Sequence, residues 1–347
     1  MMEPTLTIVI PCYNEEETLP ETISQLDRYM DELIQDNIIS TNSKLLFVDD
    51  GSKDQTWMMI YKEGLKNERV KGLKLSRNVG HQNALLAGLL TAKERSDCVI
   101  SIDADLQDDI HVIRDFLDKF QDGNEIVYGV RQNRKTDTYF KRSTAQGFYR
   151  LMGKMGVNLV YNHADYRLMS KRVLEELARF EEVNLFLRGI VPLIGFRSTC
   201  VYYDRKERLA GESKYPIKKM VAFAFDGVTS FSVTPIRLVL VSGFISFFVS
   251  LLFGLYFFAL KFFGTTVTGW TSLITSIWLI GGLQLIAIGL IGEYVGKLYK
   301  ESKRRPKYIV DINTFQLPGV SFQFSTNQRL TGEAYSLDFT RYPESNG

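Results

Sequence analysis

The sequence is poor in cysteine and has no marked excess of either charge, and these two features exclude several protein classes. Three cysteines in 347 residues, far apart and odd in number, do not form a disulfide framework and indicate a reducing compartment. No cysteine and histidine cluster has the spacing of a zinc site. With 42 basic and 40 acidic residues, the chain lacks the basic excess of proteins that bind nucleic acid.

Glycine-rich phosphate-binding motifs are also missing. The pattern GxxxxGK is absent and no GxGxxG follows the first predicted strand, which disfavours a P-loop ATPase and a nicotinamide-dependent dehydrogenase. The first residues, MMEPTLTIVIP, show no basic segment followed by an apolar one, so we expect no cleavable signal peptide. Any bound nucleotide must therefore be held by other groups.

Two long uncharged runs, Leu238–Leu260 and Leu273–Ile291, lie near the end of the chain. As helices they would be about 35 and about 28 Å long, close to the hydrocarbon core of about 30 Å. They predict two transmembrane helices joined by a short loop. Basic residues crowd the outer flanks, whereas the loop carries only Lys261, so we expect the large domain and both termini in the cytoplasm. Small residues at every fourth position from Ser242 to Gly254 suit close helix packing and permit a homo-oligomer.

The first 130 residues alternate between short apolar runs and helical patterns. Four such units with continuous apolar strands predict an α/β fold, with a Rossmann-like, mostly parallel sheet covered on both faces. The predicted strands are 6–11, 44–50, 70–76, 98–103 and 125–130, and the predicted helices are 16–35, 55–66, 82–93 and 110–120.

Polar clusters follow four consecutive predicted strands: PCYNEEE, DDGSKDQT, SRNVGHQNA and DADLQDD. Ligands of open α/β sheets bind at the carboxyl ends of the strands, so these clusters predict one shared pocket. Asp49 and Asp50 offer carboxylates for a base N–H or a ribose hydroxyl, although Asp-Gly-Ser is also ordinary turn chemistry. His81 lies near a helix start, either close to phosphate or in a capping or packing role.

Asp103 and Asp105 stand two residues apart, so in an extended chain both carboxylates face the same side. Such a pair suits Mg²⁺, which takes one or two protein carboxylates and completes its shell with phosphate and water. The acidic cluster therefore predicts a metal and diphosphate site. Asp108 and Asp109 are expected to be solvated residues of a helix-capping loop.

Several motifs occur in an order that resembles the polyisoprenyl-phosphate glycosyltransferases of glycosyltransferase family 2. The motifs are VIPCYNEEETLP, FVDDGSKDQT, RNVGHQNALLAGL, DADLQD, DYRLMSKRVLEEL and ERLAGESKYPIKKM, followed by the two uncharged runs. This family includes dolichol-phosphate mannose synthases and bacterial undecaprenyl-phosphate sugar transferases. The resemblance covers residues 5 to about 305 and implies a GT-A fold, a nucleotide-sugar donor, an undecaprenyl-phosphate acceptor and a bacterial cytoplasmic membrane location.

The resemblance also implies residue roles, which are expectations at the level of sequence. Four groups would bind the nucleotide sugar, hold the metal, carry the catalysis and receive the acceptor phosphate. The nucleotide-sugar group is Pro11, Tyr13, Glu15, Asp50, Asp103, Gln107, Arg208, Ser213 and Lys214; the Mg²⁺ or Mn²⁺ group is Asp103, Asp105 and Gln107; the catalytic carboxylates are Asp165 and Asp105; and the acceptor-phosphate cation is Arg131.

The acceptor chemistry limits what Asp165 has to do. The second pKa of a phosphate monoester is near 6, so the nucleophile is already mostly dianionic at neutral pH. We therefore expect Asp165 to position the acceptor or take a residual proton, with a helix N-cap position as the alternative. Stabilising the leaving diphosphate and holding two anions together are the larger tasks.

The sequence divides into four predicted parts. Residues 1–215 form the catalytic domain, with an amphipathic interfacial helix near 139–160; residues 216–235 form a second interfacial helix; residues 236–296 hold the transmembrane pair; and residues 297–347 form a basic segment and tail. Packing on the catalytic domain is the alternative for both interfacial helices. From Asp311 onward the sequence lies outside the resemblance and is expected to be a disordered or loosely docked tail.

The predicted activity is inverting transfer of glucose or N-acetylglucosamine from a UDP-sugar to undecaprenyl phosphate for cell-envelope glycosylation. A GDP-mannose-dependent polyprenyl-phosphate mannose synthase is the alternative within the family. A processive synthase is disfavoured because Gln-x-x-Arg-Trp is absent, and a transporter because the uncharged runs hold no intramembrane charge. A membrane-bound nucleotide-sugar sensor would leave the aspartate pair unexplained. The sequence leaves the sugar and the base open.

Overall fold

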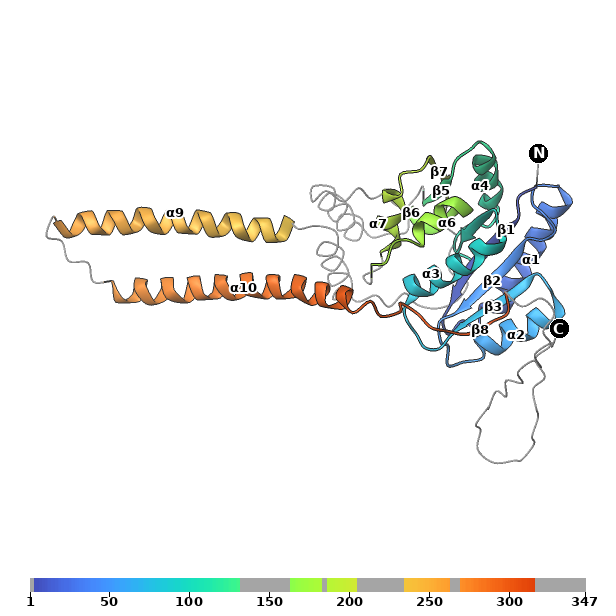
Figure 1. The fold of residues 1–347 in the computed structure, drawn as a ribbon, viewed down its shortest axis with the longest axis horizontal. Helices are drawn as coiled ribbons and strands as arrows, with labels where there is room; N and C mark the ends of the chain where they lie inside the picture. Colours follow the sequence, from blue (N-terminus) through green and yellow to red (C-terminus); the bar gives the residue numbers. More distant parts are fainter. Residues whose placement is uncertain (1–2, 132–162, 183–185, 205–233, 263–268, 316–347) are drawn as a thin grey trace, which may run out of the picture.

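The computed structural model of the chain describes residues 3–131, 163–182, 186–204, 234–262 and 269–315. These residues form an α/β domain from which two long helices extend side by side (Figure 1). Predictions on the remaining residues lie outside the described part: the interfacial helix near 139–160, all but the last two residues of the one at 216–235, and the site residues Arg208, Ser213 and Lys214.

The α/β domain is built on one eight-stranded sheet with strand order β7-β5-β6-β4-β1-β2-β3-β8. The five strands predicted from sequence are all present, within two residues at their ends. The strands are β1 Leu6–Cys12, β2 Lys44–Asp49, β3 Val70–Leu75, β4 Cys98–Ser101, β5 Ile126–Arg131, β6 His163–Ser170, β7 Ser198–Tyr203 and β8 Val310–Asn313. Strands β6 and β8 run antiparallel to their neighbours, whereas the other six strands share one direction, so the sheet is mixed but mostly parallel, as predicted.

Helices cover both faces of the sheet, as the continuous apolar strands predict. Helices α1, α2 and α4 pack on one face around Leu26, Ile60 and Phe116, and α3, α6 and α7 pack on the other around Leu85 and Ile190. The helices of this domain are α1 Leu19–Gln35, α2 Thr56–Lys66, α3 His81–Ala92, α4 Val112–Gln121, α6 Lys171–Leu177 and α7 Leu187–Leu193. The core side chains on both faces of the sheet are almost fully buried, and this burial is the main favourable term in the domain's stability.

Strand β6 lies between β4 and β5 and is the most important element that the sequence patterns did not predict. Its residues alternate between the two faces, with Tyr166 and Leu168 packed in one core and Met169 in the other. The following helix α6 is capped by Ser170, whose hydroxyl accepts from the Val173 N–H at 3.1 Å. Asp165 is therefore a strand residue, and the alternative of a helix N-cap is wrong.

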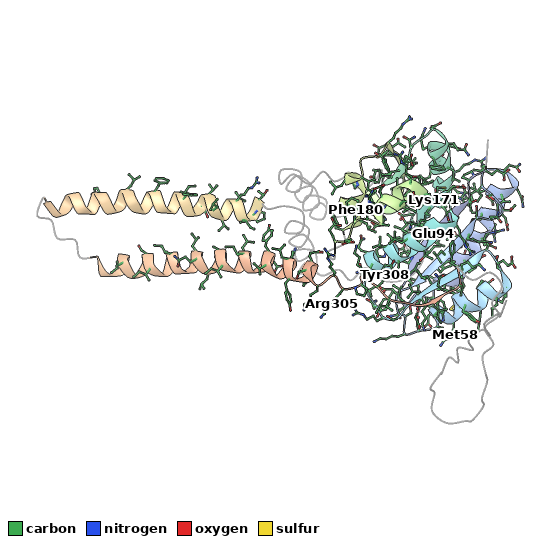
Figure 2. All side chains as sticks on the ribbon, in the orientation of Figure 1. Met58, Glu94, Lys171, Phe180, Arg305 and Tyr308 are labelled. Atoms are coloured by element: carbon green, nitrogen blue, oxygen red, sulfur yellow. The ribbon has the colours of Figure 1, made fainter. Side chains whose placement is uncertain are left out.

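The chain after α10 returns to the domain and docks on the open edge of the sheet. Strand β8 pairs antiparallel with β3, and the Thr314 hydroxyl accepts from the Gly72 N–H at 2.8 Å. Phe315 is 4% exposed in the core beside α3. In Figure 2, Arg305 and Tyr308 mark the path from α10 back to the sheet. The prediction of a disordered or loosely docked tail is thus wrong for residues 311–315. Their backbone pairs with the otherwise open edge of β3, and the Phe315 side chain is buried in the core.

The two long helices are α9 Thr234–Phe262 and α10 Trp270–Ser302, and they contain the two uncharged runs. Exposed apolar side chains occur along both, among them Phe244 and Leu252 on α9 and Leu285 and Ile288 on α10. Within the ranges that the structure describes, no helix combines the length and the apolar character needed to cross a membrane. The transmembrane helices stay a prediction.

The loop that precedes α3 is held against the end of β2 by close backbone packing. Gly51 has φ +67°, and a Cβ added there would lie 2.6 Å from the carbonyl carbon of Arg77 and 2.6 Å from the amide nitrogen of Asn78. The Asp50 carboxylate accepts from the N–H groups of Val79 at 2.7 Å and Gly80 at 3.0 Å. The loop after β2 therefore holds the backbone of the loop after β3 in place at the carboxyl end of the sheet.

We expect Gly51→Ala to destabilise the protein more than Gly123→Ala, by about 2 kcal/mol or more. Both glycines have positive φ, +67° and +84°. Both variants therefore lose about 1 kcal/mol of stability, because alanine is strained in the left-handed backbone conformation. Only at Gly51 does the new methyl group meet backbone; at Gly123 its nearest neighbour is the Arg197 Nη1 at 3.6 Å. Thermal melting of the two purified variants measures the difference, and equal losses would contradict the packing of the two loops.

Candidate active site

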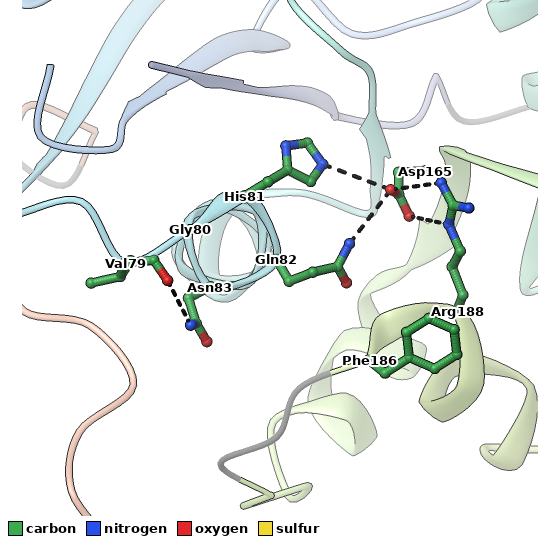
Figure 3. A pocket seen from close by; sticks show the side chains of 8 residues that line it. All are labelled: Val79, Gly80, His81, Gln82, Asn83, Asp165, Phe186 and Arg188. Atoms are coloured by element: carbon green, nitrogen blue, oxygen red, sulfur yellow. Dashed lines mark hydrogen bonds and ion pairs between the residues drawn. The ribbon is translucent and has the colours of Figure 1, made fainter. Parts of the chain in front are cut away.

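A pocket of about 350 Å³ opens between the start of α3, strand β6 and helix α7 (Figure 3). Its shape depends on the unpredicted strand, since β6 supplies one wall and α7 another. Five of its eight lining residues have polar or charged side chains, and Phe186 adds an apolar ring. The lining residues are Val79, Gly80, His81, Gln82, Asn83, Asp165, Phe186 and Arg188.

Asp165 is the centre of this pocket's polar network, although it is only 8% exposed. Its Oδ1 accepts from Arg167 Nη2 at 2.7 Å and from Arg188 Nε at 3.2 Å. Its Oδ2 accepts from Arg188 Nη2 at 3.1 Å and from Gln82 Nε2 at 3.5 Å. The backbone carbonyl of Asp165 also accepts from the Ser101 hydroxyl of β4. One carboxylate thus joins three structural elements.

The charge state of Asp165 follows from these partners. Burial acts to raise the pKa of Asp165, but the hydrogen bond from His81 and the charges of Arg188 and Arg167 outweigh it and hold the pKa well below its ordinary value. The carboxylate is therefore ionised at neutral pH and has little tendency to accept a proton. This geometry favours a role in holding the arginines over the expected role of taking a residual proton.

His81 connects this network to the predicted metal site. The Nε2 atom of His81, the first residue of α3, lies 3.7 Å from Asp103 Oδ1 and 3.7 Å from Asp165 Oδ2. Burial acts to lower the pKa of His81, but the two carboxylates outweigh it and raise the pKa above its ordinary value. Gly80 rather than His81 is the N-cap residue of α3, and proximity of His81 to a phosphate stays a prediction.

Asp103 and Asp105 follow β4 and are partly exposed, whereas Gln107 is buried. Burial and the neighbouring carboxylates Asp165, Asp108 and Asp105 raise the pKa of Asp103 to about 6, although His81 opposes the shift. The Gln107 backbone N–H donates to Asp105 Oδ1 at 3.2 Å. The Gln107 side-chain Oε1 has no hydrogen-bond partner among the described residues.

These three side chains offer only oxygen donors, which suits a hard divalent cation such as Mg²⁺ or Mn²⁺. Burial and the neighbouring carboxylates raise the pKa of Asp103, and a bound cation would favour its ionised form. Within the described part of the chain, no group of three or more His, Cys, Asp or Glu is arranged to hold a metal ion. Because the ligand atoms on offer are the oxygens of Asp103, Asp105 and Gln107, the residues present fit a cation that takes further ligands from a bound diphosphate.

The residues predicted to line the base and ribose site cluster at the ends of β1 and β2. Cys12 and Asp49 pair across these strands, Pro11 is buried in β1, and Tyr13 is 41% exposed beside it. Glu15 is tied to the same region, because its N–H donates to the Thr56 hydroxyl at 2.9 Å. The structure therefore brings Pro11, Tyr13 and Glu15 together, while their binding role stays a prediction.

The two aspartates that end β2 differ in a way the sequence does not reveal. Asp50, predicted to bind the nucleotide, is 3% exposed, and both its oxygens accept backbone N–H groups from the loop before α3. Asp49 is fully buried, and its Oδ2 has no partner among the described residues. Burial raises the pKa of both carboxyl groups. Asp49 is thus the carboxylate of the pair with an oxygen left to receive a donor.

Arg131, predicted to bind the acceptor phosphate, is engaged in a separate ion pair. Its Nη2 lies 3.0 Å from Asp108 Oδ1, and the Tyr203 hydroxyl donates to the same oxygen at 2.6 Å. Asp108 is 2% exposed, so the expectation of a solvated capping residue is wrong. The carboxylate is buried because Arg131 and Tyr203 supply the charge and the hydrogen bond that burial requires. Asp109 keeps a local role, with Oδ1 accepting from the His111 N–H at 3.3 Å.

Arg188 and Arg167 are the site residues that the sequence patterns did not identify. Arg188 opens α7 within the stretch FLRG, and Arg167 stands two residues after Asp165 in the motif DYRLM. The alternation of apolar and polar residues in HADYRLMS is the signal that could have identified a strand with Asp165 and Arg167 on one face. No pattern in the sequence indicates that Arg188 reaches the same carboxylate.

A model of glycosyl transferase family 2 matches residues 7–178, which include all four polar loops and Asp165. The uncharacterized glycosyltransferase YkoT of Bacillus subtilis (strain 168) is 61% identical over 328 residues, covering 94% of this chain and 97% of that protein. The chain belongs to glycosyl transferase family 2. Family membership and the mixed sheet together identify the α/β domain as GT-A-like.

More distant relatives of this family 2 chain carry more specific names. The bactoprenol glucosyl transferase of Shigella phage SfV is 40% identical over 307 residues, covering 88% of this chain and 97% of that protein. Among solved structures, mannosyl-3-phosphoglycerate synthase from Rubrobacter xylanophilus aligns with 65% of this chain and 72% of that chain, at 15% identity and a TM-score of 0.45. That similarity is too low to add to the family assignment.

We expect Asp103→Asn to raise the melting temperature of metal-free protein at pH 7.5 and to have little effect near pH 4. The pKa of Asp103 is about 6 in the folded protein and about 3.9 in an unfolded chain. The contribution of the Asp103 carboxyl group to the stability of the fold is therefore fully present below pH about 4 and is lost as the pH rises through 6. Melting curves in a chelator between pH 4 and 8 measure the gap between variant and wild type. A gap independent of pH would contradict the shifted pKa.

Proposed function

We propose that this chain transfers a sugar, glucose in preference to N-acetylglucosamine, from a UDP-sugar to undecaprenyl phosphate at the cytoplasmic face of a bacterial membrane. An oxygen of the lipid phosphate attacks the anomeric carbon, the bond from that carbon to the diphosphate breaks, and the nucleoside diphosphate leaves with the electron pair. A single displacement of this kind inverts the anomeric configuration.

The observation that carries the proposal is the 40% identity to a bactoprenol glucosyl transferase over 97% of that protein's length. Bactoprenol is undecaprenol, so the name of that relative supplies both the glucose and the lipid. The geometry agrees with the chemistry, because acidic side chains suited to a metal lie beside a pocket lined by cations. His81 links the acidic cluster to the pocket, because its Nε2 lies 3.7 Å from Asp103 Oδ1 and 3.7 Å from Asp165 Oδ2. A transferase that joins two anionic substrates needs both features.

The donor site is proposed at the ends of β1, β2 and β4. Tyr13 is exposed enough to stack on a base. Asp103, Asp105 and Gln107 would hold Mg²⁺ or Mn²⁺ with the diphosphate. The metal would neutralise charge on the leaving group. The closing segment predicted at Arg208, Ser213 and Lys214 is retained as part of this proposal.

Membrane attachment is proposed from the sequence of α9 and α10. Each helix contains an uncharged run near the thickness of a bilayer, and exposed apolar side chains occur along both. Figure 1 shows both helices extending from the end of the domain where α3 and α7 lie, and residues of α3 and α7 line the pocket. A lipid anchored in a bilayer around these helices would present its phosphate at that end. The alternative within the family, a mannose synthase using GDP-mannose, differs only in the donor.

Purified full-length protein, incubated with undecaprenyl phosphate, Mg²⁺ and a panel of UDP- and GDP-sugars, should form one labelled glycolipid, with UDP-glucose the preferred donor. The anomeric configuration of the product should be opposite to that of the donor. Transfer from GDP-mannose alone would show that the donor is GDP-mannose and not a UDP-sugar. Absence of transfer from every donor by folded protein would contradict the proposed function.

In the same assay, we expect Asp105→Asn to reduce the rate about 100-fold or more, since it removes a carboxylate from the proposed metal site. Asp118→Asn, which changes an exposed aspartate of α4, is the matched control and should leave the rate within twofold of wild type. Equal rates for Asp105→Asn and the control would contradict the metal site.

A further inference from the structure

The loop from Asp103 to His111, which we call the acidic loop, lies between β4 and α4 and carries the side chains proposed to hold the metal. Asp103 and Asp105 are partly exposed, whereas Ala104 and Leu106 are buried in the core with α1 and α4. Leu106 has φ +50°, a left-handed conformation that strains a side chain of its size. Such a residue keeps its conformation only where the surrounding structure determines it. The shape of the acidic loop is therefore imposed by its contacts with the rest of the domain.

Three hydroxyl groups from α1 and β6 hold the backbone of the acidic loop. Each donates a hydrogen bond to a backbone carbonyl oxygen: Thr22 to Ala104 at 2.7 Å, Tyr166 to Asp109 at 3.0 Å and Tyr29 to His111 at 3.1 Å. Thr22 and Tyr166 are buried, so water competes little for their hydrogen bonds. These three bonds hold the loop on either side of residues 105–108, and none of them is made to those four residues.

The side chain of Asp108 anchors the centre of the acidic loop. Asp108 is 2% exposed, and its Oδ1 accepts from the Tyr203 hydroxyl at 2.6 Å and from Arg131 at 3.0 Å (Nη2) and 3.3 Å (Nε). Arg131 and Tyr203 are partners across the parallel strands β5 and β7, and both stand at the carboxyl ends of those strands. Because a carboxylate is buried at low cost only where it keeps such partners, the ends of β5 and β7 determine where residue 108 lies.

This anchor is adjacent in the chain to the proposed metal ligands. Gln107 directly precedes Asp108 and is itself buried. The Gln107 backbone N–H donates to Asp105 Oδ1 at 3.2 Å, so a shift of the loop at residue 108 would also disturb the Asp105 carboxylate. Metal affinity depends strongly on the groups that orient the ligand side chains. Asp108 is therefore placed to control the metal site although its own carboxylate is engaged with Arg131 and Tyr203.

We propose that Asp108, Arg131 and Tyr203 form a positioning cluster, which holds the acidic loop in the conformation that binds a divalent cation. The cluster acts through Asp105 and Gln107 and does not itself coordinate the metal. This inference rests on the metal site of the proposed function. The contact of Arg131 with the acceptor phosphate is a separate prediction, so the experiments change Tyr203 and Asp108 and leave Arg131 in place.

Tyr203→Phe in the full-length protein is the most specific variant. It removes one hydrogen bond to Asp108 and keeps the aromatic ring, which packs edge-on against Tyr166 with the ring centroids 5.5 Å apart. Arg131 also keeps its carboxylate partner in this variant. Tyr202→Phe is the matched control, because it makes the same chemical change one residue earlier in β7, at a tyrosine that is 63% exposed.

Binding of Mn²⁺ in the presence of UDP tests the proposal without turnover, with the electron paramagnetic resonance signal of free Mn²⁺ as the readout. The Kd for Mn²⁺ should be about tenfold higher in Tyr203→Phe than in wild type, and that of Tyr202→Phe should be within about twofold of wild type. A Tyr203→Phe protein with a lower melting temperature but wild-type Mn²⁺ affinity would show a structural role alone and would overturn the proposal. Absence of Mn²⁺ binding by the wild type would overturn it as well.

The same measurement separates this inference from the proposed function. Mn²⁺ binding that is weakened in Tyr203→Phe, in a protein that forms no glycolipid from any donor, would support the positioning cluster and contradict only the proposed transfer.

In the transfer assay, the Mg²⁺ concentration that gives half the maximal rate should be about tenfold higher in Tyr203→Phe, and saturating Mg²⁺ should restore most of the rate. The KM for undecaprenyl phosphate should stay within about twofold of wild type, because the hydroxyl acts on the acidic loop. A raised lipid KM with an unchanged Mg²⁺ requirement would assign Tyr203 to the acceptor and overturn the proposal.

A double variant shows whether Tyr203 acts through Asp108. The Mn²⁺ Kd of Asp108→Asn/Tyr203→Phe should lie within about twofold of that of Asp108→Asn alone, since the two side chains form one unit. Multiplicative losses would show that Tyr203 affects the metal independently of Asp108 and would overturn the cluster. If Asp108→Asn fails to fold because Arg131 loses its partner, the comparison of Tyr203→Phe with Tyr202→Phe decides the question.

Discussion

The carboxylate of Asp165, shared between Arg167 and Arg188, is the interaction on which the site depends. Arg167 is 1% exposed and needs a partner, because an unpaired charge in the core would cost several kcal/mol. Asp165 supplies that partner, accepts further hydrogen bonds from Arg188 and Gln82, and lies 3.7 Å from His81 Nε2. Through these contacts one side chain fixes β6, the start of α3 and the start of α7 as the walls of a single pocket.

The mixed sheet makes this arrangement possible. Strand β6 runs antiparallel between β4 and β5, so Asp165 sits near Ser101, the residue that precedes the acidic cluster by two positions. His81 then bridges the two groups of charges. Asp50 and Gly51 hold the loop before α3 in place from the neighbouring strand. Residues from five separate parts of the sequence therefore determine the geometry of the pocket.

Local sequence patterns predicted most of the domain, because its first five strands are continuous apolar runs bounded by turn residues. The same patterns located the four polar loops and the Asp103 and Asp105 pair. Strand β6 was missed because it is not a continuous apolar run: Asp165 and Arg167 alternate with apolar residues, and the burial of these two charges depends on each other. Strand β8 was missed because a four-residue strand has no period of its own and forms only against the edge of β3.

Roles that depend on partners across the fold were the least predictable. Asp50 and Asp49 are adjacent and chemically identical, yet one holds a loop and the other keeps an unpartnered oxygen. Asp108 has the sequence context of a solvated residue in a run of aspartates and is buried only because Arg131 and Tyr203 reach it. Arg188 became recognisable as a site residue only when α7 was placed beside β6.

The stability of Asp165→Asn as a function of pH is the most direct test of the central ion cluster. Because the folded pKa of Asp165 lies well below its unfolded value near 3.9, its stabilisation is present above that pH and is lost as the pH falls through the folded pKa. Melting temperatures should therefore show the variant far less stable than wild type at pH 7, with the difference shrinking below pH about 4. Equal melting temperatures at pH 7 would contradict an ionised Asp165 at the centre of the site.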